Sequence, residues 1–225
     1  KKKVGVVLEK RNVASNIKAQ VGCAFDITGS MQGLYNSGAV QALAERLLAV
    51  ALRFDDNGSL DSWSFCTSAD ELPAITEKNY SRYVSESMLN NKKITKWGGT
   101  NYAPAFKQIA SFYFGKSETN VVAEEKTVSG FFGKMFGKKE KVFTNVVTSS
   151  DGQNDGKMPV YIMFITDGEN FDEADTWQQL EKMKNENVYI EFIGIGKSQF
   201  RFCQEAADRY GNVGFVQIKD LEKTS

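Results

Sequence analysis

The chain has 225 residues, of which 41% are hydrophobic and 25% are charged, and its 28 basic residues balance its 28 acidic ones. This composition is typical of a soluble globular domain with a full core, and the neutral net charge gives no reason to expect nucleic acid or an anionic membrane as a general partner. Histidine is absent, which excludes Ser-His-Asp and Cys-His catalysis and zinc sites that use imidazole.

The cysteines and the ends of the chain bear on location. Cys23, Cys66 and Cys203 are odd in number and lie in apolar sequence, so we expect unpaired core residues and a reducing, cytoplasmic location. No apolar run is long enough to span a bilayer, and the run that follows the three N-terminal lysines is too short for a secretory signal. The chain does not begin with methionine, which we expect of a fragment of a longer protein.

Apolar patterns along the chain alternate between those of strands and those of helices. In chain order they predict a lead-in strand and loop at 1–17, a strand at 18–25, a loop at 32–38, a helix at 40–54, a turn at 55–58, strands at 61–67 and 72–76, helices at 79–89 and 102–113, a strand at 157–165, a helix at 172–185, a strand at 188–195, a helix at 198–210 and a strand at 213–218. Strands that alternate with helices imply βαβ units. We therefore predict an α/β fold, a doubly wound three-layer sandwich around a mainly parallel sheet.

One segment interrupts this alternation. Residues 116–157 separate a helix from the strand that should follow it within a few residues, so we expect a single domain over 1–225 with an inserted excursion. The insertion carries a Gly/Phe/Lys stretch at 129–139, a candidate strand at 142–147 and a polar link at 149–156. We interpret the stretch as a solvated loop, and contact with a membrane surface or a partner through Phe131–Phe136 is the alternative.

Three separated segments carry oxygen ligands. They are Asp26-Ile27-Thr28-Gly29-Ser30, Gly98-Gly99-Thr100 and Thr166-Asp167-Gly168. The first and third follow apolar strand patterns, and loops beyond the carboxyl ends of parallel strands meet at one edge of a sheet. Two carboxylates brought together would repel unless a cation lay between them, and hard cations prefer oxygen ligands. The simpler alternative for Asp26, Thr28 and Ser30 is a strand-end turn with a helix cap.

The combined pattern resembles the metal-ion-dependent adhesion site (MIDAS) of von Willebrand factor A (vWA) domains, which reads D-x-S-x-S, then T, then D. The matching residues are Asp26, Thr28, Ser30, Thr100 and Asp167, and Thr28 stands where serine is usual. The resemblance covers roughly residues 18–220. It implies a vWA fold in which the three hydroxyls ligate Mg²⁺ (or Mn²⁺ or Ca²⁺), while the two aspartates act directly or through water. It also implies a protein partner that presents an Asp or Glu to the metal, without catalysis.

Three shorter stretches narrow the resemblance. Val6–Lys10, Phe54–Gly58 and Trp97–Tyr102 look similar to cytoplasmic bacterial proteins linked to tellurium resistance, the TerF-like proteins. This likeness implies a bacterial stress-response role, and a calcium-binding domain before Lys1 would suit that context.

Other interpretations of the acidic residues remain open. Asp26 invites comparison with two classes of enzyme. Aspartic proteases carry the motif D-T-G, which Ile27 interrupts in this chain, and metal-dependent phosphohydrolases carry a second carboxylate at the position where this chain has Thr28. The segment 55–61 resembles a partial calcium loop, but its spacing favours a turn. Glu169 and Asp172 follow the third segment closely, and we expect solvated loop carboxylates with helix capping by Asp172.

Overall fold

The computed structural model describes residues 18–55, 57–127, 139–150, 152, 158–168 and 170–221, with the strands at 116–127 and 139–150 described as backbone alone. The chain divides into two compact units, one of residues 1–110 and 156–225 and the other of residues 111–155. The predicted lead-in at 1–17 and the Phe131–Phe136 segment, for which membrane contact is the alternative, lie outside the described residues.

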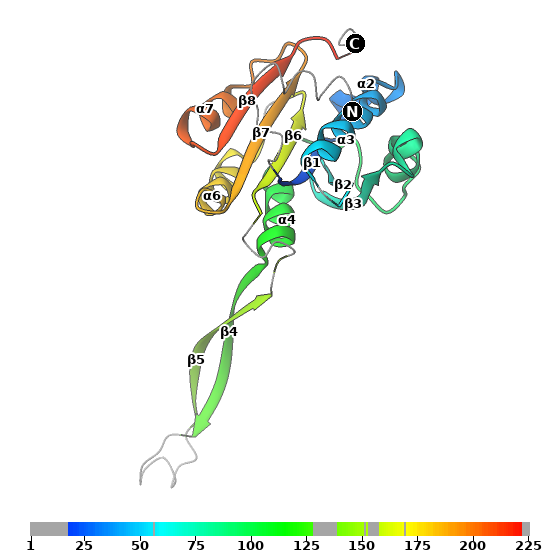
Figure 1. Ribbon diagram of the computed structural model, residues 1–225. Helices are drawn as coiled ribbons and strands as arrows, with labels where there is room; N and C mark the ends of the chain where they lie inside the picture. The colour runs from blue at the N-terminus through cyan, green and yellow to red at the C-terminus, as the bar shows by residue number, and fades with distance from the viewer. Residues whose placement is uncertain are drawn as a thin grey trace. The chain divides into compact units, whose positions relative to one another are not determined.

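The first unit is built on a six-stranded sheet with the order β3-β2-β1-β6-β7-β8 (Figure 1). All neighbouring strands are parallel except β2 and β3. The central strands are apolar at nearly every position because helices cover both of their faces. The predicted α/β fold with a mainly parallel sheet is therefore confirmed. The strands are β1 (Gln20–Asp26), β2 (Ser59–Phe65), β3 (Ala69–Thr76), β6 (Val160–Thr166), β7 (Val188–Ile195) and β8 (Val213–Ile218).

Helices pack on both faces of this sheet (Figure 1). One face carries α2 (Gln32–Asn36), α3 (Ala39–Phe54) and the short helices η1 (Gly29–Met31), η2 (Tyr80–Arg82) and η3 (Val84–Leu89). The other face carries α4 (Ala103–Phe114), α6 (Glu173–Met183) and α7 (Arg201–Arg209).

The alternation of side chains along β1 and β6 divides the core between the two faces. Phe25 and Ile165 belong to the cluster under α3. Phe164 points the other way, where its ring stacks on Phe106 of α4 at 4.6 Å and on Phe65 of β2 at 4.5 Å. The α4 side is thus an aromatic core whose stacked rings fix α4 against the strands that end at the site described below.

The helix predicted at 79–89 forms with irregular winding, as the 3₁₀ turn η2 followed by the π-helix η3. The side chain of Gln41, on α3, explains the change. Its amide nitrogen donates to the Tyr80 carbonyl at 2.6 Å, and its amide oxygen accepts from the Val84 N–H at 3.0 Å. These two backbone groups would bond to each other in an α-helix, so Gln41 inserts into the ladder and diverts it.

The loop predicted at 32–38 is wrong, since residues 32–36 form the helix α2. Its one buried side chain, Tyr35, donates from its hydroxyl to the Asp26 carbonyl at 2.9 Å. This tertiary contact, together with packing in the core, holds a helical turn that Gly33 and Asn36 would not favour by propensity.

Two expectations about the environment can be compared with the structure. Cys23, Cys66 and Cys203 are buried and belong to no disulfide among the described residues, as predicted for core residues. Within the described part of the chain, no helix combines the length and apolar character needed to cross a bilayer.

The second unit contains two antiparallel strands, β4 (Lys116–Thr127) and β5 (Lys139–Ser150). Their register runs without interruption from Lys116 opposite Ser150 to Thr127 opposite Lys139. The candidate strand at 142–147 lies within β5.

We expect the first unit to fold without this hairpin, because all six strands of its sheet lie outside residues 111–155. Replacing residues 118–154 with a short Gly/Ser linker should leave one cooperative thermal transition and native-like circular dichroism. An insoluble or molten product would show that the hairpin belongs to the core.

Candidate metal centre

The register of the two central strands brings the first and third oxygen-bearing segments together. β1 pairs with β6 in parallel, with Phe25 opposite Ile165, so Asp26 and Thr166 leave the sheet side by side. The second segment is fixed beside them by backbone hydrogen bonds. The Trp97 N–H donates to the Ile27 carbonyl at 2.8 Å, and the Asn101 N–H donates to the Cys66 carbonyl at 2.9 Å. The three segments therefore converge beyond the carboxyl ends of the strands, as in other open α/β sheets.

Four of the five predicted ligands form one hydrogen-bonded network. The Ser30 hydroxyl donates to Asp167 Oδ1 at 2.9 Å, and the hydroxyls of Thr28 and Ser30 lie 3.0 Å apart. The Thr28 N–H donates to Asp26 Oδ1 at 2.9 Å. A contact between residues 137 positions apart in sequence, Ser30 and Asp167, thus places two carboxylates and two hydroxyls within one cluster.

The fifth residue, Thr100, lies on the neighbouring loop. It is buried, and its carbonyl accepts the Phe171 N–H at 2.8 Å, which joins the second segment to the loop after β6. Among the residues that the structure describes, the Thr100 hydroxyl forms no hydrogen bond.

The electrostatics of this cluster are unfavourable without a cation. Burial raises the pKa of Asp26 to about 6; the hydrogen bonds from Thr28 and Thr166 oppose that rise, and the nearby Asp167 adds to it. Burial also raises the pKa of Asp167, against the hydrogen bond from Ser30. No Lys or Arg of the described segments forms an ion pair with either carboxylate.

The donor set fits a divalent cation. It combines two carboxylates, which a cation would stabilise in their ionised forms, with three hydroxyl oxygens, and hard cations such as Mg²⁺ and Ca²⁺ take such ligands. In the described ranges there is no group of three or more Cys, Asp or Glu side chains that could hold a metal.

Two residues of the centre lay outside the set that we predicted as ligands. Thr166 is fully buried, and its hydroxyl donates to Asp26 Oδ2 at 2.8 Å. The Tyr102 hydroxyl donates in turn to the Thr166 oxygen at 3.0 Å, while the Tyr102 ring packs against Phe65 and Phe164. Thr166 stands next to Asp167 in sequence, which was the available signal, whereas Tyr102 has the pattern of a core residue.

Asp172 joins the loop after β6 to the start of α4. Its carboxylate accepts the N–H groups of Tyr102 at 2.8 Å and Ala103 at 3.1 Å, at the start of α4. The side chain of Thr176 donates to the same carboxylate at 2.9 Å. Asp172 therefore caps α4 rather than α6, the helix that it precedes, and the expected capping takes place across the fold. Glu169 lies outside the described residues.

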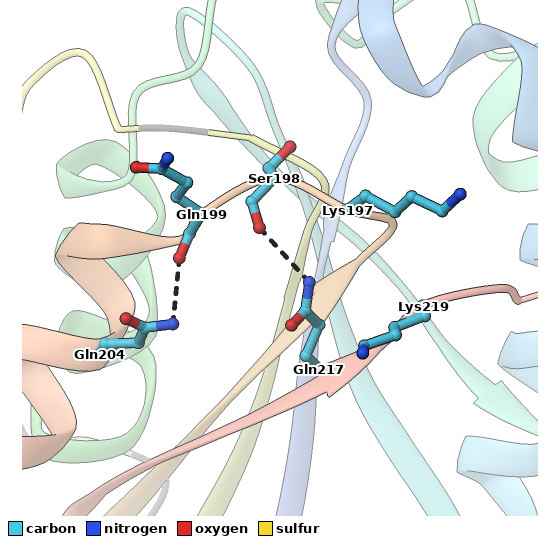
Figure 2. Close-up of a pocket in the computed structure, with 6 residues that line it drawn as sticks. All are labelled: Lys197, Ser198, Gln199, Gln204, Gln217 and Lys219. Atoms are coloured by element: carbon cyan, nitrogen blue, oxygen red, sulfur yellow. Dashed lines mark hydrogen bonds between the residues drawn. The ribbon is translucent and has the colours of Figure 1, made fainter.

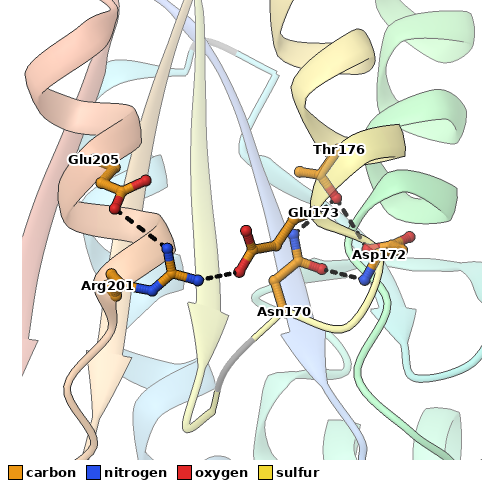
Figure 3. Close-up of polar contacts among 6 residues, drawn as sticks. All are labelled: Asn170, Asp172, Glu173, Thr176, Arg201 and Glu205. Atoms are coloured by element: carbon orange, nitrogen blue, oxygen red, sulfur yellow. Dashed lines mark hydrogen bonds and ion pairs between the residues drawn. The ribbon is translucent and has the colours of Figure 1, made fainter.

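Around this carboxylate, Asn170 Oδ1 accepts the Asp172 N–H at 3.0 Å. Farther out, Arg201 pairs with Glu173 at 2.6 Å and with Glu205 at 3.3 Å (Figure 3). These ion pairs are exposed and contribute little, whereas the buried contacts of Asn170 and Asp172 fix the loop.

Where the structure describes it, the candidate calcium loop at 55–61 is a bend at Asn57 and Gly58 that leads into β2, in keeping with the turn favoured from its spacing. Asp55 accepts the Val21 N–H at 3.2 Å and the Asn57 N–H at 3.0 Å, and Asn57 accepts the Ser59 N–H at 2.7 Å. The side-chain oxygens of Asp55 and Asn57 thus serve the local backbone.

Comparisons with known proteins identify the family of the chain. The chain matches the family model described as "vWA found in TerF C terminus" over residues 18–124 and 119–225. It is 31% identical over 229 residues to the uncharacterized protein YcbR of Bacillus subtilis (strain 168), covering all of this chain and 78% of that protein.

Solved structures share the fold at low sequence identity. Proximal thread matrix protein 1 from the mussel byssus, with a zinc-occupied MIDAS motif, has a TM-score of 0.59 at 15% identity, over 92% of this chain and 45% of that one. The manganese-loaded TRAP protein of Plasmodium vivax has a TM-score of 0.53 at 14% identity, over 93% and 71%. The chain thus spans less than half of the mussel protein.

We predict opposite outcomes for two adjacent glycines of the second segment. A methyl group on Gly98 would lie 2.4 Å from the Thr67 hydroxyl oxygen, which accepts the Gly99 N–H at 3.0 Å. On Gly99 the nearest atom would be at an ordinary 3.5 Å. Gly98→Ala should therefore lower the free energy of unfolding by about 1–3 kcal/mol, whereas Gly99→Ala should change it by less than about 0.5 kcal/mol. Urea denaturation measures both, and equal effects would contradict this account.

Proposed function

Because the chain belongs to the vWA family, in the group found at the TerF C terminus, we propose that it is a protein-interaction module that binds its partner through a divalent cation. The observation that carries this proposal is the cluster of Asp26, Thr28, Ser30 and Asp167, with buried Thr100 on the adjoining loop, whose Gly98 carbonyl accepts the Gly29 N–H.

The ligands that we propose are the hydroxyls of Thr28, Ser30 and Thr100, with Asp26 and Asp167 acting directly or through water. When bound, the cation supplies an electrophilic centre whose coordination an Asp or Glu of the partner protein completes. The zinc and manganese named for the two structural neighbours support a divalent ion in general. We propose Mg²⁺ as the physiological ion, with Mn²⁺ or Ca²⁺ as alternatives.

The chain's own residues would prepare this site before the partner arrives. Hydrogen bonds from the Thr28 N–H and the Thr166 hydroxyl orient the Asp26 carboxylate. Asp172 fixes the start of α4, and the Phe171 N–H fixes the Thr100 carbonyl. A prearranged set of donors reduces the free-energy cost of ordering the site on binding.

The accessibility of Asp26 favours binding over turnover. A phosphohydrolase would use this carboxylate as its nucleophile, yet Asp26 is fully buried and each of its oxygens already accepts a hydrogen bond. Thr28 also stands where such an enzyme would carry its second acid. We therefore propose that the module is not an enzyme.

For its biological setting we propose the bacterial cytoplasm and a tellurium-resistance or stress-response system. The family model, named for TerF, and the Bacillus relative support this setting.

Cation binding should stabilise the fold. An ion that binds the native state alone adds about 2.7 kcal/mol at a hundredfold excess over its dissociation constant, so Mg²⁺ or Mn²⁺ should raise the melting temperature of the wild type. Asp167→Ala should abolish this rise, whereas Asp208→Ala, an exposed acid on α7, should keep it. Thermal unfolding with and without EDTA measures the shift, and an equal rise in wild type and Asp167→Ala would refute the assignment.

Partner binding should depend on the Thr100 hydroxyl. Proteins captured from a bacterial lysate in Mg²⁺ and released by chelator would be identified, and their affinity measured with the purified chain. Thr100→Ala should abolish that binding and leave the fold intact, whereas Thr100→Ser, which keeps the hydroxyl, should preserve it. A partner whose affinity is indifferent to chelator and to Thr100→Ala would contradict the mechanism, and metal-dependent turnover of a phosphate ester would support the enzyme instead.

A further inference from the structure

Two adjoining cavities lie at the ends of β7 and β8, and one of them reaches the candidate metal centre. A cavity of about 430 Å³ is lined by Asp167 and also by Lys197 and Lys219. A second one, of about 600 Å³, shares Lys197, Ser198 and Lys219 with the first and adds Gln199, Gln204 and Gln217 (Figure 2). The lysines thus face spaces that begin at a predicted metal ligand and continue away from it.

The loop that carries Lys197 is held in place by side-chain hydrogen bonds. The Gln217 amide donates to the Gly196 carbonyl at 2.9 Å and to the Ser198 carbonyl at 3.3 Å. The Gln204 amide donates to the Gln199 carbonyl at 3.0 Å (Figure 2). The Ser198 hydroxyl donates to the Asp167 carbonyl at 2.8 Å. The loop is therefore tied to β8, to α7 and to the metal centre.

The two lysines are available to an incoming anion. Both are exposed, and within the described part of the chain neither forms an ion pair or a hydrogen bond. The larger cavity is lined by no acidic side chain, and the smaller one is lined by Asp167 and Asp220. A cation at the metal centre would offset Asp167, which leaves one acid against two lysines. Counted over the described residues that line the two cavities, the charge beside the metal centre is then net positive.

We propose that Lys197 and Lys219 form a second anion subsite, which takes another carboxylate of the same partner segment whose first carboxylate lies at the metal centre. This inference rests on the proposed function and narrows the partner to an acidic segment with at least two carboxylates. Lysine suits this role because its ammonium group is a mobile point charge that meets a carboxylate without fixed geometry.

The test uses the double variant Lys197→Gln/Lys219→Gln. The control is the double variant Lys107→Gln/Lys182→Gln, which removes the same two positive charges at exposed positions of α4 and α6. The probes are a fluorescent peptide of six glutamates and a matched peptide with one glutamate among glutamines. Their affinities are measured by fluorescence anisotropy in Mg²⁺ and in EDTA. The thermal shift with Mg²⁺ alone reports whether each variant is folded and binds the ion.

In Mg²⁺ the six-glutamate peptide should bind the subsite variant about threefold to tenfold more weakly than the wild type or the control, since exposed ion pairs have effects of this size. The one-glutamate peptide should bind all three proteins equally. Equal affinity of the subsite variant and the control for the six-glutamate peptide, or no binding of this peptide to the wild type, would overturn the subsite. Binding that is insensitive to EDTA but weakened by the lysine substitutions would instead refute the cation bridge and keep the subsite.

Discussion

The arrangement at the carboxyl edge of the sheet depends on one constraint, a carboxylate buried at the end of the central strand. Burying a charge is costly unless the group is hydrogen-bonded and paired. Asp26 takes the Thr28 N–H on one oxygen and the Thr166 hydroxyl on the other, and Tyr102 supports Thr166 from the aromatic core. These contacts supply donors but no positive charge. Because the Asp167 carboxylate lies close by, a bound cation would balance the negative charge of the cluster, which the hydrogen-bond donors alone do not.

The loops around this carboxylate are held by backbone features that also serve the site. Trp97 adopts a left-handed conformation, with φ of 63°, and its edge-to-face contact with Tyr35 joins the second segment to α2. A conformation of this kind in a large non-glycine residue costs of order 1–3 kcal/mol and persists where the surroundings fix it. Here those surroundings include the Ile27 carbonyl, which accepts the Trp97 N–H, and the same turn leads directly into Gly98–Thr100.

Much of this structure was predictable from the sequence, because apolar runs such as 160–165 identify buried strands and parallel strands bring their following loops to one edge. That rule predicted that the three segments would meet, and the resemblance to the MIDAS pattern named the five proposed ligands. Contacts between distant side chains were not predictable in this way. Gln41 diverts a helix about forty residues later, Asp172 caps α4 from the loop after β6, and Tyr35 stabilises α2 by reaching Asp26. The helix propensities of neighbouring residues do not depend on such distant partners and therefore cannot predict them.

The central claim is that three segments build one cation site at the end of β1 and β6. Anomalous diffraction from crystals grown with Mn²⁺, recorded at the manganese absorption edge, tests it most directly. We predict one strong peak among Asp26, Thr28, Ser30, Thr100 and Asp167, which disappears when the same crystals are soaked in EDTA. A peak elsewhere on the chain, or ordered crystals without a peak at these residues in saturating Mn²⁺, would contradict the claim.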